Sequence, residues 1–437
     1  MNVIFFALIA IAFVVTGYHQ LTWVAPTADA ISPMLALGNG IIDSAKGAVT
    51  LALGLVGVMA FFLGLMKVAE AGGLLLIIAR LLRPLLVRLF PDVPADHPAM
   101  GAMIMNLSAN ALGLGNAATP FGIRAMQALD TLNTSKGTAT NAMALFLAIN
   151  TSSITLLPTG VIALRAAAGS ADPAGILPTT LFATLCSTVV AILSAKFYQR
   201  LWPLDPPATS AAGETTGSPV DATSEPPPEV TLPDAPTDGY PAWVSYLSLL
   251  ILVSLIPVAV VLGASLGPWI IPGLAVLLLG FGVARRVRVY ECFVDGARDG
   301  FEVAVRIIPY LVAILVAVGM FRASGAMAFV VNGIGGFTAA LGMPAEALPM
   351  ALLRPLSGSG AYGVLAATIA DPATGPDTYV GYLVSTLQGS TETTFYVLAV
   401  YFGAVQVRRV RHALAAGLTA DLAGIIGAVV ACLYLFG

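Results

Sequence analysis

The chain has 437 residues, of which 58% are hydrophobic and only 10% are charged. Because a soluble domain is nearer a quarter charged, this composition excludes a soluble protein of this size and predicts a multi-pass membrane protein with the lipid bilayer as its surroundings. The formal net charge of −3 carries little information, since the location of the charges matters more than their sum.

The apolar N-terminal stretch is the first candidate span. No Lys or Arg occurs in Met1–Gly17, whereas a signal peptide normally begins with a basic segment. We therefore expect a retained transmembrane helix at Asn2–Val24, within a first unit of residues 1–30. Cleavage after Ala30 is the open alternative.

A second apolar segment is expected from Asp43 to about Met66, and the stretches after it are not plain spans. In Leu74–Phe90 three arginines interrupt a leucine-rich run, which is typical of a basic amphipathic helix in the membrane interface. Ala99–Gly122 is apolar but rich in asparagine and glycine, which predicts a re-entrant hairpin of two half-helices with a polar tip. A polar loop is expected at Arg124–Lys136.

Another apolar segment contains a polar break. Ala139–Ile149 leads into Asn150-Thr151-Ser152-Ser153, and Pro158 follows, so we expect a broken helix. Ile176–Ala195 is typical of a plain span that ends at basic residues. These elements form a first repeat over residues 31–204.

Residues 205–240 separate this repeat from the rest of the chain. The stretch is rich in Pro, Ser, Thr and acidic residues and has no Lys or Arg, which predicts a disordered linker. The two apolar segments Trp243–Leu262 and Ile270–Val283 then predict a two-helix return pair within residues 241–290.

The last unit, residues 291–437, repeats the pattern of the first repeat. Asp295–Arg298 corresponds to Asp43–Lys46, and Gly319–Arg322 corresponds to Gly64–Lys67. Three further correspondences follow in the same order, with offsets that drift from 252 to about 239 residues. Five ordered matches are the signature of a diverged internal repeat.

The repeat places Gln388–Thr394, a hydroxyl-rich run with a single carboxylate, where Asn150–Ser153 falls in the first half. Glycine and hydroxyl side chains are unfavourable inside a helix, so we expect a second broken helix here. A surface loop between two short helices is the open alternative. The second re-entrant hairpin is expected at Ala347–Ala370.

The distribution of Lys and Arg predicts how the repeats cross the membrane. Loops rich in these residues mark the cytoplasmic side, so the N-terminus and the linker are expected to be cytoplasmic. Each repeat then has three crossings plus a re-entrant hairpin, in opposite orientations. The predicted fold class is an all-α integral membrane protein with two inverted-topology repeats, re-entrant hairpins and broken transmembrane helices, as in secondary transporters.

The polar residues of the hairpins and breaks are the candidate solute-binding residues, because all four segments should meet near the membrane midplane. Half-helix N-termini and an arginine suit an anionic or carbonyl group, whereas hydroxyl and carboxamide oxygens suit Na⁺. The first repeat contributes Asn106, Asn110, Asn116, Thr119, Asn150, Thr151 and Ser152, and the second contributes Arg354, Ser357, Ser359, Gln388, Ser390, Thr391, Glu392 and Thr393.

These residues also have structural interpretations. Glu392 is either a proton carrier or the partner of Arg354 in a buried ion pair. Arg354 is either a ligand for a carboxylate or phosphate group or a helix-end arginine that reaches the interface. The asparagines are either binding residues or caps and interhelical contacts. Asp421 lies inside the last span, and its role stays open.

Other chemical motifs are absent from the sequence. Gly113-Leu114-Gly115-Asn116 lacks the third glycine of a dinucleotide fingerprint, Gly358-Ser359-Gly360 follows no strand, and there is no P-loop. The cysteines and histidines are scattered, which fits neither a disulfide set nor a metal site. We therefore expect no enzyme activity, no catalytic residue, no metal and no cofactor, with Na⁺ or a proton as the coupling ion.

Long motifs in both repeats resemble known families. His97–Met103, Asn106–Asn110, Leu112–Pro120 and Asn150–Ser153 resemble the spore maturation protein A family, and Leu353–Gly360 and Ser385–Thr394 resemble the spore maturation protein B family. Both belong to the nucleoside-recognition, or gate, superfamily, and they usually occur as separate chains. The resemblance implies a fusion of two halves into an inverted-repeat transport core, similar to that of concentrative nucleoside transporters. It implies neither a particular solute nor sporulation.

The sequence therefore predicts an ion-coupled secondary transporter of a small polar or anionic solute, nucleoside-like or a carboxylate, in the bacterial inner membrane. The rival hypothesis is a non-transporting membrane scaffold or assembly factor that acts in envelope or spore-type maturation. The expected partners are lipid and the solute, without nucleic acid, and homo-oligomerisation is left open.

Overall fold

The computed structural model describes residues 2–25, 27, 30–113, 115–152, 154–203, 236 and 238–437. Over these residues the chain is all-α, and its one β interaction is an isolated bridge between Thr138 and Arg409. The predicted linker, residues 205–240, lies almost entirely outside the described residues.

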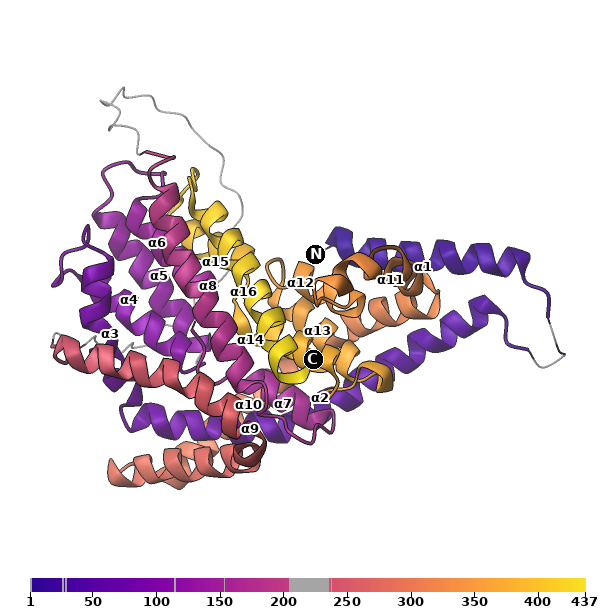
Figure 1. Cartoon of the computed structure of the whole chain (residues 1–437), viewed down its shortest axis with the longest axis horizontal. Coiled ribbons are helices and arrows are strands. Elements are labelled where there is room, and N and C mark those ends of the chain that lie inside the picture. Colours follow the sequence, from indigo (N-terminus) through magenta and orange to yellow (C-terminus); the bar gives the residue numbers. More distant parts are fainter. Residues whose placement is uncertain are drawn as a thin grey trace.

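The helices follow the order predicted from the repeat (Figure 1). Before the linker they are α1 (Asn2–Thr22), α2 (Pro33–Ala71), α3 (Leu74–Leu89), α4 (Pro98–Ala111), α5 (Gly115–Thr131), α6 (Asn141–Ser152), α7 (Thr159–Ala167) and α8 (Leu177–Tyr198). After it they are α9 (Ala242–Ala284), α10 (Val289–Ala323), α11 (Ala326–Ala340), α12 (Leu348–Leu353), α13 (Gly358–Ile369), α14 (Tyr379–Ser390), α15 (Thr394–Gly403) and α16 (Ala413–Phe436), with 3₁₀ turns at Ala345–Ala347 and Pro372–Thr374.

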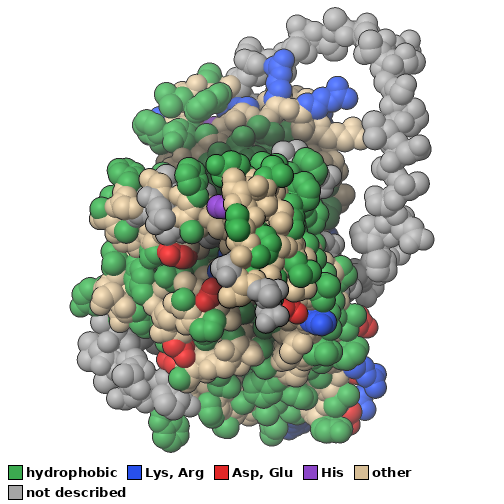
Figure 2. Space-filling model, turned by 90° about the vertical axis from the view of Figure 1, so that its right-hand side faces the viewer, with side chains coloured by type: hydrophobic (Ala, Val, Ile, Leu, Met, Phe, Trp, Pro, Cys, Tyr) green, Lys and Arg blue, Asp and Glu red, His purple; other side chains and the backbone are tan. Residues whose placement is uncertain are grey.

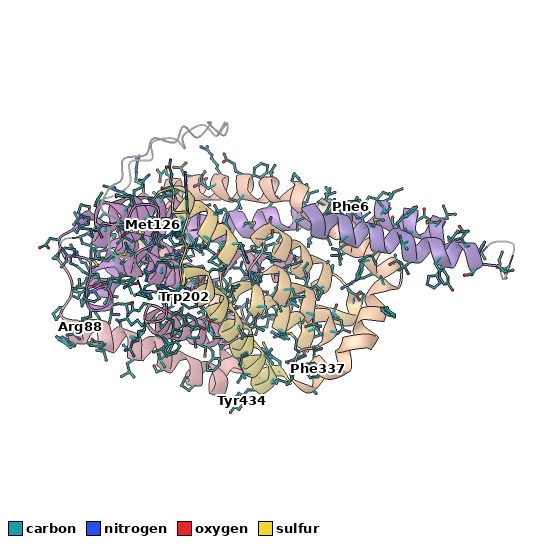
Figure 3. All side chains as sticks on the ribbon, turned by 90° about the horizontal axis from the view of Figure 1, so that it is seen from above. Phe6, Arg88, Met126, Trp202, Phe337 and Tyr434 are labelled. Atoms are coloured by element: carbon teal, nitrogen blue, oxygen red, sulfur yellow. The ribbon has the colours of Figure 1, made fainter. Side chains whose placement is uncertain are left out.

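The helices have the length and the apolar exterior that a bilayer requires. By length and composition, α2, α8, α16 and Phe5–Thr22 of α1 could each cross a membrane. Phe6, Phe337 and Tyr434 lie on the outside of the molecule and are mostly exposed (Figure 3). The face in Figure 2 shows many hydrophobic side chains and few charged ones. The chain is a multi-pass membrane protein.

α2 begins earlier than the predicted start of the second span at Asp43. The Ser32 hydroxyl accepts a hydrogen bond from Leu35 N (3.4 Å), and Pro33 occupies the first helical position. Both features favour a helix start there. Asp43 and Lys46 therefore lie within the helix and do not open it.

The predicted loop at Arg124–Lys136 is wrong in its first part, because α5 continues to Thr131. Ala125, Met126 and Leu129 are buried in the core that surrounds the first hairpin. Their spacing is that of one helix face, and this apolar face outweighs the polar residues between them.

In each half, a glycine with a positive φ separates the first long helix of the repeat from the helix that follows it. Gly73 (φ 85°) separates α2 from α3, and Gly325 (φ 80°) separates α10 from α11. Only glycine adopts this left-handed conformation without a steric penalty. After it, each half continues with a two-part hairpin, a broken helix and a final long helix.

The first long helices of the two halves pair with each other. Gly319 of α10 lies against Ser44 of α2, and Gly296 lies against Gly64, so α2 and α10 run antiparallel. In the sequence repeat, Ser44 corresponds to Gly296 and Gly64 corresponds to Gly319. The two contacts are therefore equivalent under the repeat. This is expected if a two-fold axis perpendicular to the helices relates the two halves. This arrangement supports inverted repeats, whose orientation across the membrane stays a prediction.

The predicted return pair is a single helix, α9, that does not run straight. Near its start, Tyr240 N donates to Arg80 O (3.2 Å), and near its end Gly282 packs against Val68. A straight helix of 43 residues would be about 64 Å long. The two ends of α9 contact residues 80 and 68, and the chain between those two residues spans at most about 43 Å, which is less than the length of a straight helix. The segment therefore changes direction, as a return pair requires.

The two halves meet along α8 and α16. One buried apolar cluster surrounds α4–α6 and the other surrounds α12–α14, and α8 and α16 contribute residues to both. The Ser187 hydroxyl of α8 donates to Ala420 O of α16 (2.8 Å). In Figure 1 these two helices pass between the first hairpin and the second.

Candidate solute-binding site

Four interrupted segments meet at the boundary between the halves. Their helices are separated at residues 112–114, 153–158, 354–357 and 391–393. In the first half, Leu156 N donates to Ala111 O (2.9 Å), and in the second half Phe395 N donates to Pro355 O (3.1 Å). The broken helix of each half is thus bonded to the tip of its own hairpin.

The two broken helices are also joined to each other. Glu392 N, in the second break, donates to Thr151 O at the end of α6 (2.7 Å). This bond satisfies one of the carbonyl groups that the end of a helix leaves unpaired. The backbone of one half therefore completes the helix end of the other.

A glycine–tyrosine contact further links each hairpin to the other half. Tyr401 of α15 lies against Gly122 of α5, and Tyr362 of α13 lies against Gly160 of α7. A Cβ atom would approach the tyrosine oxygen to 2.2 Å at Gly122 and to 2.6 Å at Gly160, so neither site admits a side chain without rearrangement. Tyr362 follows Gly122 by 240 residues and Tyr401 follows Gly160 by 241, so the contact occurs twice with the two residue types exchanged.

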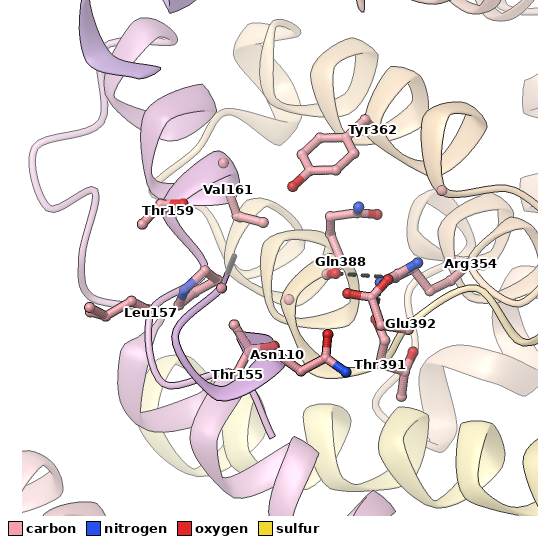
Figure 4. A pocket seen from close by; sticks show the side chains of 15 residues that line it. Asn110, Thr155, Leu157, Thr159, Val161, Arg354, Tyr362, Gln388, Thr391 and Glu392 are labelled. Atoms are coloured by element: carbon pink, nitrogen blue, oxygen red, sulfur yellow. Dashed lines mark hydrogen bonds and ion pairs between the residues drawn. The ribbon is translucent and has the colours of Figure 1, made fainter. Parts of the chain in front are cut away.

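A cavity of about 200 Å³ lies where these contacts converge (Figure 4). Sites for drug-sized ligands are commonly ~300–1,000 Å³, so this cavity suits a small solute. Both halves contribute to its wall: Asn110, Gly113, Thr155, Leu157, Pro158, Thr159, Gly160 and Val161 from the first, and Arg354, Gly358, Tyr362, Gln388, Gly389, Thr391 and Glu392 from the second.

Arg354 is buried and organises the second break. Its Nε donates to Gln388 O (3.1 Å), its Nη1 donates to the Thr393 hydroxyl (2.9 Å), and its Nη2 donates to Thr391 O. These acceptors belong to the last turn of α14 and to the break itself, where the helix leaves carbonyl groups without partners. The guanidinium group therefore fixes the backbone that forms this side of the cavity.

Glu392 brings a carboxylate to the same place. Its Oε2 lies 3.6 Å from Arg354 Nη2, and 49% of its side chain is exposed. In Figure 4 the carboxylate lies beside Arg354 and Gln388 within the cavity. The structure contains the ion pair of Glu392 with Arg354, with the carboxylate half-exposed, and the role of Glu392 as a proton carrier stays a prediction.

A polar chain extends from the cavity into the first half. Asn110 Nδ2 donates to Asn150 Oδ1 (2.9 Å), and the Tyr401 hydroxyl donates to the same oxygen (3.4 Å). Asn106 Nδ2 in turn donates to the Tyr401 oxygen (3.1 Å). These linked side-chain hydrogen bonds fix the tip of the first hairpin against α6 and against α15 of the other half.

Two parts of the chain, residues 52–168 and 304–408, match the family model described as Gate: Nucleoside recognition, and together they make up just over half of the sequence. The chain belongs to the gate family. Helices α4–α7 lie within the first gate segment and α12–α15 within the second, so the four interrupted segments all fall inside the matched parts.

Two relatives from Bacillus subtilis (strain 168) are similar to this gate protein. Spore maturation protein B is 46% identical over 167 residues, which are 38% of this chain and 93% of that protein. Spore maturation protein A is 46% identical over 187 residues, which are 41% of this chain and 94% of that protein. No solved structure matches the chain.

The structure brings part of the predicted site of this gate protein together. Asn110, Arg354, Gln388, Thr391 and Glu392 line the cavity. Asn150, Thr151 and Thr393 lie directly behind it, through the bonds to Asn110, Glu392 and Arg354 described above.

The remaining predicted residues serve the backbone or lie apart from the cavity. The Ser152 and Ser390 hydroxyls donate to Ile149 O and Leu387 O within their own helices. The Ser357 hydroxyl accepts from Gly360 N (3.0 Å) and so caps α13, with the Ser359 hydroxyl 3.5 Å from it. Asn106 lies behind the cavity, Thr119 lies in α5 away from its wall, and the side chain of Asn116 lies outside the described residues.

Sequence reasoning missed the two tyrosines. Tyr401 sits in an apolar run away from the second break, and Tyr362 lies just after the Ser- and Gly-rich run at residues 357–360, where the chain becomes apolar again. The signal that could have found them is the repeat itself, because its offset pairs each tyrosine with a glycine in the other half. Thr155 and Thr159 were also missed, although they flank the predicted break at Asn150–Ser153.

Proposed function

We propose that this gate protein is an ion-coupled secondary transporter of a small polar or anionic solute, nucleoside-like or a carboxylate. The observation that carries the proposal is the polar cavity formed by interrupted helices of both gate segments. In a membrane protein, irregular backbone at membrane depth is tolerated where it is buried in protein or lines a water-filled cavity. Discontinuous helices at a repeat interface are the usual place for a transported solute.

The cavity offers both charge signs and neutral hydrogen-bonding groups. Arg354 is the cationic group, but its Nε and parts of both terminal nitrogens are already bonded to the second break. An anionic solute would therefore compete with the Glu392 carboxylate for the face of Arg354 that they share. Gln388, Asn110 and Tyr362 would supply the neutral donors and acceptors.

The cellular setting is part of the proposal. The protein would lie in the bacterial inner membrane, with its N-terminus and linker on the cytoplasmic side, because the loops rich in Lys and Arg then lie inside. Lipid and the solute would be its partners, and Na⁺ or a proton its coupling ion, with no cofactor, nucleic acid or enzymatic step.

A second candidate function is a non-transporting scaffold or assembly factor. The names of the two relatives, spore maturation proteins A and B, favour it. In that role, the bonds between the breaks would only hold the two halves together. The two functions differ in whether the cavity is reached by a solute from water.

A ligand screen of the purified full-length protein in detergent tests the proposal. The panel contains nucleosides, dicarboxylates, phosphorylated metabolites and Na⁺, and the readout is the thermal melting temperature. A ligand at 100 times its Kd that binds only the folded state stabilises it by about 2.7 kcal/mol. We expect at least one stabilising compound, and we expect Arg354→Ala and Glu392→Gln to abolish its effect.

Cysteine labelling provides the complementary test. Cysteine at Thr155, in the cavity wall, should react with a charged thiol reagent, and a hit from the screen should protect it. Because the chain has three native cysteines, Cys186, Cys292 and Cys432, the test uses a background without them. A well-folded protein with no stabilising ligand and an unreactive cavity would favour the scaffold.

A further inference from the structure

A second polar site lies behind the break between α14 and α15, on the last helix. Asp421 occupies the middle of α16 and is only 3% exposed. The Thr394 hydroxyl donates to its Oδ2 (2.6 Å), whereas its Oδ1 has no hydrogen-bond partner within the described residues. None of the ion pairs of the described chain involves Asp421 either.

Two glycines let α16 bring this carboxyl group against the breaks. Gly417 and Gly424 lie one turn before and one turn after Asp421, on the same helix face. A Cβ atom would lie 2.9 Å from Thr394 Cγ2 at Gly417 and 2.7 Å from Thr391 Cγ2 at Gly424. Larger residues would therefore push α16 away from the second break.

A carboxyl group in this position has to be neutralised. An ionised carboxylate without a paired cation is costly to bury, and an ionisable residue inside a membrane protein is by default a candidate for a functional role. The candidates for the neutralising species are a metal cation, bound by several oxygens, and a proton, bound by one.

The surrounding backbone favours the proton. A Na⁺ ion would need additional oxygen ligands, but several carbonyl oxygens at the two breaks already accept hydrogen bonds from the protein. Thr151 O accepts from Glu392 N (2.7 Å), and Ser152 O accepts from the Thr184 hydroxyl (2.9 Å). Gln388 O accepts from Arg354 Nε (3.1 Å). A proton, in contrast, binds to a single oxygen of Asp421 and requires no set of further oxygen ligands.

The other titratable groups nearby do not take this role. Arg354 and Glu392, the charged residues at the break, are paired with each other (3.6 Å). The helices packed against α16 are α6, which has no titratable side chain, and α8, α14 and α15. These three carry Cys186, Lys196, Tyr198, Tyr379, Tyr382, Tyr396 and Tyr401, and no hydrogen bond or ion pair recorded for them reaches Asp421.

The geometry points to Asp421 as a proton-binding site, with the Thr394 hydroxyl as its hydrogen-bond donor and the second break as its neighbour. This inference rests on the proposed function and deepens it, because it names the coupling ion and moves it from Glu392 to Asp421. Loss of the proton would place a negative charge beside the first residue of α15. The protonation state of Asp421 would thereby be coupled to the conformation of the break between α14 and α15, which forms part of the cavity wall.

Infrared difference spectroscopy of the full-length protein in lipid membranes tests the site without any solute. We expect the carbonyl stretch of a protonated carboxyl group, which disappears when the pH is raised and shifts when the aspartates are labelled with ¹³C. Asp421→Asn should abolish this band, whereas Asp377→Asn, at a partly exposed carboxylate on a loop, should leave it in place. Thr394→Val, which removes only the hydrogen bond, should shift its frequency.

The outcomes separate this inference from the transport proposal. Absence of a protonated aspartate band in the wild-type protein would overturn it, and so would a band that NaCl removes at constant pH, because Asp421 would then bind Na⁺. The ¹³C labelling of the wild-type protein keeps the test valid if Asp421→Asn does not fold. A band that depends on Asp421 in a protein with no stabilising ligand and an unreactive cavity would support the proton site and favour the scaffold over the transporter.

Discussion

Among the side chains that the structure describes, each gate segment contains one buried arginine, and the two have different surroundings. Arg165 of α7 is completely buried and donates to Asp172 O (3.1 Å), Pro173 O (3.3 Å) and Pro376 O (2.5 Å). It also pairs with Asp377 (3.1 Å). Arg354 is similarly buried, but its acceptors belong to a broken helix and its carboxylate partner lines the cavity.

The difference lies in the carboxylates. Asp377 is held by the Ser170 hydroxyl (2.5 Å) and by Ala171 N (2.7 Å) as well as by Arg165, so this network is closed. Arg165 therefore joins the loop after α7 to the loop before α14, across the two halves. Glu392 has Arg354 as its ion-pair partner and faces the cavity, where a solute can reach it. We therefore predict a structural role for Arg165, and the proposed solute-binding role falls to Arg354.

The largest effect on stability is expected at Arg165. In Arg165→Ala, buried carbonyl groups of two loops lose their donor, and breaking a buried ion pair typically costs about 3–5 kcal/mol. We expect a marked fall in the thermal melting temperature in detergent, with any loss of transport explained by loss of folded protein. Arg285→Ala is the matched control, because the Arg285 guanidinium lies 5.4 Å from the Phe281 ring, much as that of Arg165 lies 4.3 Å from the Tyr382 ring, but Arg285 is exposed. Equal effects at both arginines would contradict the structural role of Arg165.

A smaller loss of stability and a complete loss of ligand binding are expected at Arg354. Arg354→Ala removes the donor to two carbonyl groups of the second break, for which about 1–3 kcal/mol is typical. Arg354→Lys is the informative companion, because it keeps the charge beside Glu392 but cannot replace the planar set of donors. We expect it to regain part of the stability and none of the ligand-induced rise in melting temperature. Normal solute flux in either variant would remove Arg354 from the site.

The sequence predicted the second of these arginines and missed the first, for a physical reason. Arg354 lies beside prolines, serines and glycines that interrupt an apolar segment, so a break and a polar cluster were visible in the chain itself. Arg165 lies within an ordinary apolar helix, and Pro376 and Asp377 are more than 200 residues away. Nothing local distinguishes such an arginine from one at a helix end.

Local sequence signals likewise account for the parts of the fold that were predicted, and contacts between distant segments account for most of those that were not. Breaks at glycine- and hydroxyl-rich runs were located from the sequence, because those residues are unfavourable inside a helix wherever they occur. Only five of the fifteen residues of the cavity wall were predicted as site residues, and Tyr362 was missed because its contact with Gly160 joins segments that are distant in the sequence. The predicted start of the second span at Asp43 was wrong because the cap at Ser32 and the proline at Pro33 start α2 earlier, and charged residues such as Asp43 and Lys46 are compatible with a helix interior.

The carboxylate of the functional pair should matter for transport and little for stability. In Glu392→Gln the ion pair with Arg354 is lost, but a half-exposed pair of this kind contributes about 1 kcal/mol or less. We expect a melting temperature close to that of the wild-type protein and no flux of a solute that the wild type carries into proteoliposomes. Because Glu392 N rather than its side chain bonds to Thr151 O, the backbone link between the halves should survive. Normal flux would show that Glu392 only fills space beside Arg354.

The smallest effect is expected at the carboxylate of the structural pair. In Asp377→Asn the side chain keeps one oxygen for the Ser170 hydroxyl or for Ala171 N, and its 38% exposure lets water replace part of the lost interaction with Arg165. Exposed and partly exposed pairs are worth about 0–1 kcal/mol, so the melting temperature should fall far less than in Arg165→Ala. Solute flux should be unchanged, in contrast to Glu392→Gln. A fall as large as that of Arg165→Ala would mean that charge pairing, and not the bonds to loop carbonyls, holds the two halves together.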